Sequence, residues 1–187
     1  MMYLSKGIPL WRPTGEAVSV SHCGALHKLA GIQAELWLAG QFHPAYARSP
    51  EQGAALEQLV GLGIVVTCNE TDTVALFRLL TNCTICPIRI KKRPALLSYM
   101  EHRLLRWIRH AGLRLTIAEL TLLNERDVRP VPSLLGEENR QTLTESIYTT
   151  ETIRDGILET LMEKSPARDD TVQAVLGLLR KRKIFLV

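Results

Sequence analysis

The sequence predicts a mostly helical α+β protein, with a helix–strand unit at each end and a helical segment between them. Amphipathic stripes with the 3.6-residue period of a helix recur along the chain, and apolar runs typical of strands follow two of them. Residues 54–66 also align with residues 174–186 without a gap, with Ala, Leu, Leu and Ile at the same four places. This alignment indicates an internal repeat, although any amphipathic helix followed by an apolar strand gives a similar pattern. We divide the chain into an N-terminal unit (1–82), a basic linker and helical segment (83–149), and a C-terminal unit (150–187).

Length and composition narrow the class of protein. The chain has 187 residues, of which 46% are hydrophobic and 22% charged, as in ordinary globular proteins. The formal net charge of +4 permits a nucleic-acid partner without requiring one. No stretch reaches the roughly 18 apolar residues of a membrane helix, and the N-terminal apolar run is too short for a signal peptide. We therefore expect a cytoplasmic protein with no membrane partner, whose four cysteines are thiols.

The N-terminal unit is predicted to begin with an extended segment and two helices. Residues 17–20 alternate weakly, as in a strand. A helix follows within residues 22–39, where apolar side chains recur at helical spacing before a glycine. A second helix begins at Ser49, which can cap it, because a proline follows directly and Gln52 lies three residues later. Two glycines within residues 61–63 end this helix.

A β-hairpin is predicted to complete this unit. Residues 64–67 are β-branched and indicate a strand, residues 69–72 favour a turn, and residues 74–80 are typical of a returning strand. Helix, connection, helix and hairpin in this order resemble the winged helix-turn-helix superfamily, and residues 150–187 resemble it in part. The resemblance implies a bacterial-type transcription regulator with a recognition helix before the hairpin. A minority of such proteins recognise peptides or proteins instead.

The rest of the chain is predicted to be mainly helical. A strong amphipathic helix covers residues 95–111, and Thr116 with Glu119 forms a capping box that opens the next helix. A loop-rich stretch follows, with a short helix near residues 137–145.

The last two helices are predicted from their apolar stripes. One starts at about residue 150, and Asp169 or Asp170 caps the other, which precedes a strand at residues 184–187. The side chains of the first that are expected to point inward are Ile153, Ile157, Leu158 and Leu161.

The densest group of positive charge lies on and just before the helix at residues 95–111. Several cations along one helix face release the counterions of DNA when they contact its phosphates. We therefore predict that this helix binds the backbone of duplex DNA. The predicted contact residues are Arg89, Lys91, Lys92, Arg93, Arg103, Arg106 and Arg109. Changing the three helical arginines to glutamate is expected to abolish binding while the fold survives. A solvated helix face is the alternative interpretation, and for the basic run at residues 180–183 a structural role at a helix C-terminus is equally expected.

The predicted recognition helix is poorly suited to DNA. Between residues 50 and 63 it contains two glutamates and no lysine or arginine. Its two glutamines can read bases, but apart from Arg48 just before the helix nothing there holds phosphate. This favours a protein-binding or dimerising role for the first unit, through Glu51, Gln52, Glu57 and Gln58. The alternative function is therefore a protein- or peptide-recognition adaptor without catalysis, and we expect a homodimer.

Metal and catalytic chemistry have little support in the sequence. Cys83 and Cys86 have the spacing of half a zinc site, but two further ligands would have to come from His22, Cys23, His27 or Cys68. A redox pair or two partly buried thiols are the alternatives. Phosphate-binding glycine motifs, a nucleophile elbow and a metalloprotease helix motif do not occur in the sequence. We predict no enzyme and no cofactor.

Overall fold

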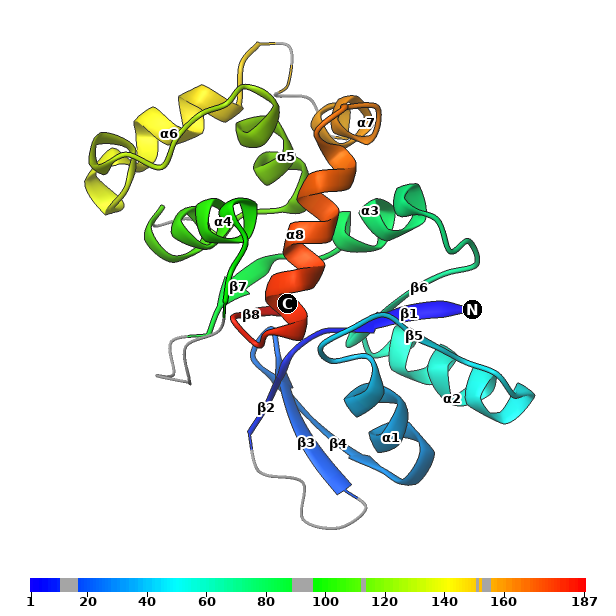
Figure 1. Ribbon diagram of the computed structural model, residues 1–187. Coiled ribbons are helices and arrows are strands. Elements are labelled where there is room, and N and C mark those ends of the chain that lie inside the picture. The colour runs from blue at the N-terminus through cyan, green and yellow to red at the C-terminus, as the bar shows by residue number, and fades with distance from the viewer. Residues whose placement is uncertain (11–16, 89–95, 112–113, 151, 153–155) are drawn as a thin grey trace.

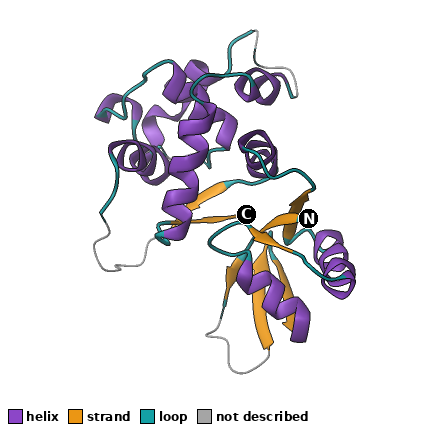
Figure 2. Ribbon diagram, turned by 45° about the vertical axis from the view of Figure 1, so that its right-hand side comes forward, coloured by secondary structure: helices purple, strands orange, loops and turns teal. Residues whose placement is uncertain are grey.

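The helices and strands gather in different halves of the molecule. The computed structural model describes residues 1–10, 17–88, 96–111, 114–150, 152 and 156–187. Most helices form the half that is uppermost in Figure 1, and two small sheets with two helices form the other half. Figure 2 shows the same separation by colour, with both chain ends near the middle. The predicted α+β class with much helix is confirmed, whereas winged-helix units are not.

Strand β1 (Met2–Ser5) lies between two hydrophobic cores. It pairs antiparallel with β5 (Ala45–Tyr46) on one side and β6 (Val65–Cys68) on the other. Because side chains alternate along a strand, Met2 and Leu4 enter the larger core and Tyr3 enters the smaller one. Strand β1 is therefore buried along its whole length between the two cores.

The second sheet contains a hairpin where the sequence suggested the start of a helix. Strands β2 (Ile8–Pro9), β3 (Ala17–His22) and β4 (Ala25–Ala30) are antiparallel neighbours in that order. Cys23 and Gly24 form a two-residue turn with φ of 48° and 84°, the left-handed values of a tight hairpin. The strand at residues 17–20 is confirmed. The helix predicted within residues 22–39 begins only at Gly31, in the second half of that range.

Helices α1 (Gly31–Ala39) and α2 (Pro50–Gly61) pack against these strands and enclose the smaller core. Ser49 Oγ accepts a hydrogen bond from Gln52 N–H at 3.2 Å, and Gln52 Oε1 accepts one from Arg48 N–H at 2.8 Å. The predicted cap of α2 is confirmed. Trp37 fills the centre of the smaller core and is fully buried.

The predicted returning strand at residues 74–80 is wrong. This segment is helix α3 (Thr73–Thr81), capped by Asp72, whose carboxylate accepts a hydrogen bond from Ala75 N–H at 2.7 Å. β6 consequently pairs with β1 rather than with a following strand, so the described residues 64–81 form no wing. The buried side chains of α3 belong to the larger core, so that core extends across the boundary that we predicted at residue 82.

The larger core is built mainly from helices α3, α4 (Tyr99–His110), α5 (Ile117–Glu125), α7 (Ile157–Glu163) and α8 (Arg168–Arg180). α8 runs through the middle of this half in Figure 1. Strands β7 (Ile85–Pro87) and β8 (Ile184–Leu186) pair antiparallel at its base. The C-terminal strand is confirmed, and part of the predicted basic linker is a strand.

The helix starts in this half are confirmed in part. Thr116 and Glu119 form the predicted capping box, and α4 begins with a second box, formed by Ser98 and Glu101. The short helix near residues 137–145 is α6 (Arg140–Ile147), preceded by two 3₁₀ turns, Pro132–Leu134 and Glu137–Asn139.

Two details of the last helices differ from the prediction. Leu158 of α7 is buried and Ile157 is partly buried, but Leu161 is exposed; Ile153 lies outside the described residues. Asp169 and Asp170 lie in the first turn of α8, whose N-cap is Ala167. There they face the positive end of the helix dipole without capping it.

In both helix–strand units of the suggested repeat, the helix ends in the same type of turn. Ile64 N–H donates to Leu59 O at 3.2 Å after α2, and Lys183 N–H donates to Leu178 O at 2.9 Å after α8. Gly63 and Arg182 occupy the left-handed position, with φ of 73° and 53°, as in a Schellman motif. The equivalent residues of the two turns are therefore Gly63 and Arg182. The gapless sequence alignment pairs Gly63 with Lys183 instead, so it is out of register by one residue at this point.

A buried ion pair joins α4 to α8. Glu101 is 5% exposed, and its two carboxylate oxygens lie 2.5 and 2.7 Å from Lys181 Nζ. Burial opposes ionisation, but Lys181 and the N–H of Ser98 together hold the pKa of Glu101 below its usual value. Lys181 was part of the second basic run, and this contact supports the structural role for it.

The Glu101–Lys181 pair predicts a specific loss of stability in acid. The folded pKa of Glu101 is lower than that of an unfolded chain, so the pair stabilises fully above the ordinary glutamate pKa of about 4.3. This contribution is lost as the pH falls through the lower, folded pKa. The free energy of unfolding in urea should therefore fall more between about pH 6 and about pH 3.5 in the wild type than in Glu101→Gln. Equal decreases in both proteins would contradict this role of the pair.

Candidate nucleic-acid interface

Helix α4 has a buried side and an exposed side with different chemistry. Its buried side packs into the larger core, chiefly through Trp107, which is fully buried. Its one acidic residue, Glu101, is buried in the ion pair with Lys181. The exposed side consists of Tyr99, His102, Arg106, Arg109 and His110. The surface of α4 is therefore basic and aromatic, with no exposed carboxylate of its own.

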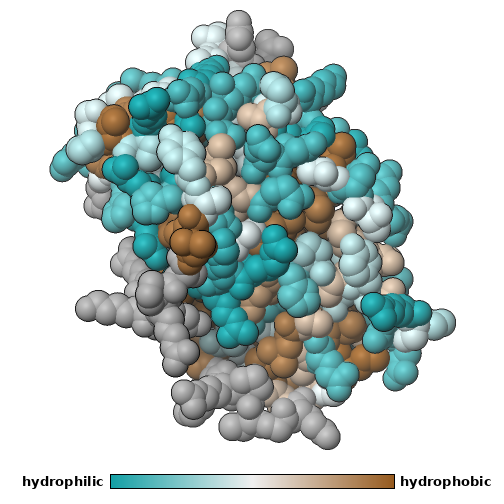
Figure 3. Space-filling model, in the orientation of Figure 1, coloured by the Kyte–Doolittle hydropathy of each residue, from teal (hydrophilic) through white to brown (hydrophobic). Residues whose placement is uncertain are grey.

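Arg106 and Arg109 have no ion-pair partner among the described residues. They lie one turn apart, so their charges repel and slightly destabilise the helix. Figure 3 shows hydrophilic residues over most of the visible face, with hydrophobic ones in small separate groups. Free guanidinium groups at this spacing are suited to successive phosphates.

Arg103 does not belong to this surface, and the prediction that it shares the exposed basic side is wrong. It is 8% exposed. Its Nη1 donates to the Asp127 carboxylate at 2.8 Å, and its Nη2 donates to the carbonyl oxygens of Val128 at 2.9 Å and Leu123 at 3.4 Å. Arg103 thus fixes the end of α5 and the following loop against α4. Because Arg103 is buried, the fold is no longer expected to survive the change of all three helical arginines to glutamate.

The other predicted basic residues fall into two groups. Arg89, Lys91, Lys92 and Arg93 lie outside the described residues. In the second basic run, Arg182 lies over the ring of Phe42, with 4.8 Å from its Cζ to the ring centroid, a cation–π contact. Together with the Lys181 ion pair, this contact ties the run to the rest of the fold.

A small pocket of about 200 Å³ opens between α4 and residues 129–131. Its wall on the α4 side is formed by Tyr99, His102, Arg103 and Arg106. Its other wall is formed by Arg129, Pro130 and Val131. No sequence pattern selects Arg129, because it lies more than twenty residues after Arg106 in a loop-rich stretch. It is the Arg103–Asp127 contact that brings this loop to α4.

The four residues predicted to bind a partner on α2 have different surroundings. Glu51 and Glu57 are exposed, with no ion-pair partner among the described residues. Gln52 is half-buried and accepts the hydrogen bond from Arg48. Gln58 Oε1 accepts a hydrogen bond from Gln33 Nε2 of α1 at 2.6 Å. Two of the four side chains therefore serve the fold, and two glutamates remain on the surface.

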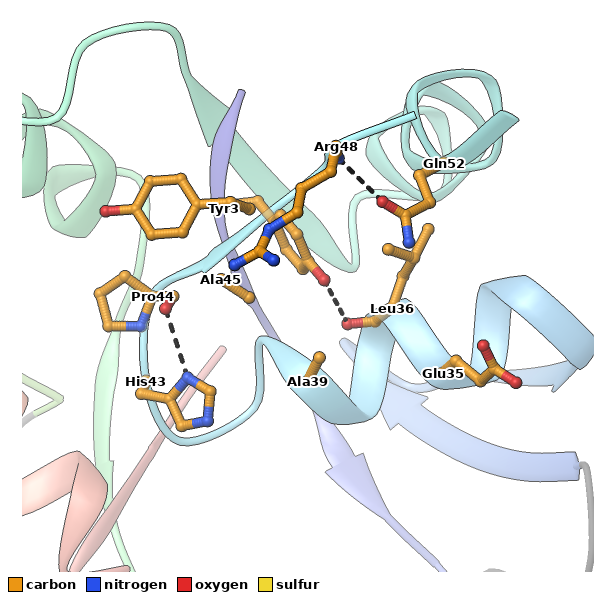
Figure 4. A pocket seen from close by; sticks show the side chains of 10 residues that line it. Tyr3, Glu35, Leu36, Ala39, His43, Pro44, Ala45, Arg48 and Gln52 are labelled. Carbon is orange, nitrogen blue, oxygen red and sulfur yellow. Dashed lines mark hydrogen bonds between the residues drawn. The ribbon is translucent and has the colours of Figure 1, made fainter. Parts of the chain in front are cut away.

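A groove of about 490 Å³ lies between α1, α2 and the segment around β5. Figure 4 shows Glu35 on the α1 side and Arg48 extending from the opposite side. Tyr3 donates its hydroxyl to the carbonyl oxygen of Leu36 at 3.1 Å, within this lining. Burial raises the pKa of Tyr3, so this side chain is a neutral hydrogen-bond donor there.

The cysteine pair considered for zinc is buried. Cys83 donates its thiol to the carbonyl oxygen of Leu79 at 3.5 Å, and burial raises its pKa to about 12. Burial also raises the pKa of Cys86. A zinc ligand must be a thiolate, and these surroundings favour the thiol. In the part of the chain that the structure describes, no three histidine, cysteine or acidic residues lie close enough to hold a metal.

Comparisons with other proteins give no relative from which a function could be transferred. No helix within the described ranges has the length and apolar character needed to cross a membrane. No family model, curated protein or solved structure matches this chain.

Proposed function

We propose that this protein binds the phosphate backbone of duplex DNA through the exposed side of α4, as a transcription regulator does. The observation that carries the proposal is the pair Arg106 and Arg109, both exposed and without an ion-pair partner among the described residues. His102 and His110 lie on the same exposed side of α4. We call these four residues the α4 stripe. Arg106 and Arg109 repel each other, and neither forms an ion pair with the rest of the described fold, so a polyanionic partner is the physical reason that we assign to their placement.

The position of the stripe supports contact with a long ligand. α4 lies on the outside of the helical half, with its apolar side in the core. An α-helix with its side chains is about 10–12 Å across, which matches the major-groove width of about 12 Å, and the 12 residues of α4 give it a length of about 18 Å to lie along the backbone. A homodimer, which we also propose, would present two copies of α4 to one duplex.

Titration of a labelled random duplex by fluorescence anisotropy tests the proposal. Binding at about 50 mM salt that weakens by more than tenfold at about 200 mM salt is the expected result. A duplex that stays free at the lowest salt concentration would overturn the proposal.

A second candidate function, recognition of a protein or peptide, has one observation in its favour. The groove beside α2 has both polar and apolar lining, and two exposed glutamates of α2 lie on the helix that forms one of its sides. Small-molecule and peptide sites often combine these features.

The second candidate predicts that Glu57→Lys weakens a partner complex. Reversal of an exposed charge at an interface slows association and raises the dissociation constant, by about tenfold. A partner isolated with the wild type should be tested by calorimetry against Glu57→Lys and, as a control, Glu145→Lys on α6. Equal affinity for all three proteins would count against this function.

A further inference from the structure

We infer that the pocket between α4 and residues 129–131 binds a phosphomonoester, the terminal phosphate of a nucleotide or of a nucleic-acid strand. The inference rests on the proposed function and adds the chemical class of a ligand group. Its two sides come from distant parts of the sequence, and both contribute a guanidinium group, from Arg106 on α4 and from Arg129 on the loop.

Charge is the first argument. Among the described residues, none that lines the pocket is acidic, and three are arginines. The nearest carboxylate in an ion pair with them is that of Asp127, 2.8 Å from Arg103 Nη1 and 4.0 Å from Arg129 Nη2. Three guanidinium groups and one carboxylate leave a formal excess of two positive charges. A phosphomonoester carries close to two negative charges at pH 7, whereas a phosphodiester within a strand carries one.

Hydrogen-bond geometry is the second argument. Arg103 is occupied by Asp127 and two carbonyl oxygens, so it is a positioning residue rather than a ligand. Arg106 and Arg129 are exposed, and the Arg129 side chain is 72% exposed. With the imidazole of His102, they offer donors from two sides of the pocket. A terminal phosphate has three unesterified oxygens to accept from these donors.

Size is the third argument. A pocket of about 200 Å³ is smaller than the 300–1,000 Å³ typical of sites for drug-sized ligands. It suits one small charged group, with the rest of the ligand outside. Tyr99 also lines the pocket and is 73% exposed, so its ring offers a surface on which the adjoining base can stack.

Binding of two labelled single strands that differ only in a 5′-phosphate tests the inference. The wild type should bind the phosphorylated strand at least tenfold more tightly. In Arg129→Met this preference should disappear, while the affinity for the 5′-hydroxyl strand stays within about twofold, because the α4 stripe is intact. Arg126→Met is the matched control. It removes a guanidinium three residues away whose side chain donates to Ser146 O, and it should keep the preference.

The source of the phosphate is decided by two further probes. Adenosine monophosphate that competes with the phosphorylated strand at millimolar concentration, where inorganic phosphate does not, identifies a nucleotide-sized ligand. Competition by both identifies the phosphate group alone as sufficient. Equal affinity of the wild type for both strands would overturn the inference and, if the duplex still binds with a steep salt dependence, would leave the proposed function standing. A protein that binds neither strand nor duplex would overturn both.

Discussion

Replacing Arg103 with glutamate is expected to lower the free energy of unfolding by about 4 kcal/mol or more, because it places a carboxylate beside another carboxylate in a buried site. Arg103 is 8% exposed and donates to Asp127 and to the carbonyl oxygens of Leu123 and Val128. Glutamate would remove the Arg103 donor from Val128 O, place its own carboxylate against the two carbonyl oxygens and repel Asp127. Urea unfolding followed by circular dichroism measures the loss.

The milder change Arg103→Met separates burial from charge. Methionine keeps much of the aliphatic packing but donates no hydrogen bond. Asp127 is 68% exposed and returns to water, and Leu123 O still accepts from Val128 N–H at 2.9 Å, so a loss of about 2 kcal/mol is expected. If Arg103→Glu unfolds at the same urea concentration as the wild type, the buried site described for this side chain is wrong.

The double variant Arg106→Glu, Arg109→Glu is expected to behave in the opposite way. Both side chains are exposed, so the free energy of unfolding should change by less than about 1 kcal/mol. Affinity for duplex DNA should fall on the order of 100-fold at low salt, because two attractive charges become repulsive. Anisotropy and urea unfolding on the same preparations measure both quantities.

A matched control removes the effect of net charge. Lys28 of β4 and Lys164 after α7 are exposed. They belong to other elements than α4 and lie far from it in the sequence. Lys28→Glu, Lys164→Glu changes the net charge by the same amount and should weaken binding by less than about fivefold. An equal loss of affinity in both double variants would mean that net charge, and not the stripe on α4, attracts the duplex.

Local signals predicted the elements whose structure depends on local contacts. Ser49 and Thr116 begin helices as expected, since a capping side chain bonds within its own turn. Residues 74–80 were assigned as a strand because a short apolar run fits a strand or a buried helix equally well. The missed signal was Asp72, a capping residue three positions before Ala75.

Long-range pairing explains the remaining errors in the fold. β1 is recognisable only with β5 and β6, which lie more than forty and sixty residues further along the chain. The hairpin at residues 17–30 depends on a left-handed Cys23, a residue that rarely adopts this conformation. A sequence pattern contains neither kind of information.

The sequence predicted that Arg106 and Arg109 lie on a basic surface, but it did not predict where that surface ends. Arg103 lies four residues before Trp107 and three after Met100, so its position already bordered the apolar stripe. That spacing was the available sign of burial. The partner of Arg103, Asp127, and the facing Arg129 come from a loop whose path only the three-dimensional structure gives.

The salt dependence of duplex affinity, compared between the wild type and Arg106→Gln, Arg109→Gln, tests most directly whether these two side chains contact phosphates. Each phosphate contact contributes about 0.9 to the slope of log affinity against log salt concentration. Loss of both contacts should therefore make the slope shallower by about 1.8. Parallel lines for the two proteins would show that Arg106 and Arg109 do not touch the backbone, and would contradict the proposed function of α4.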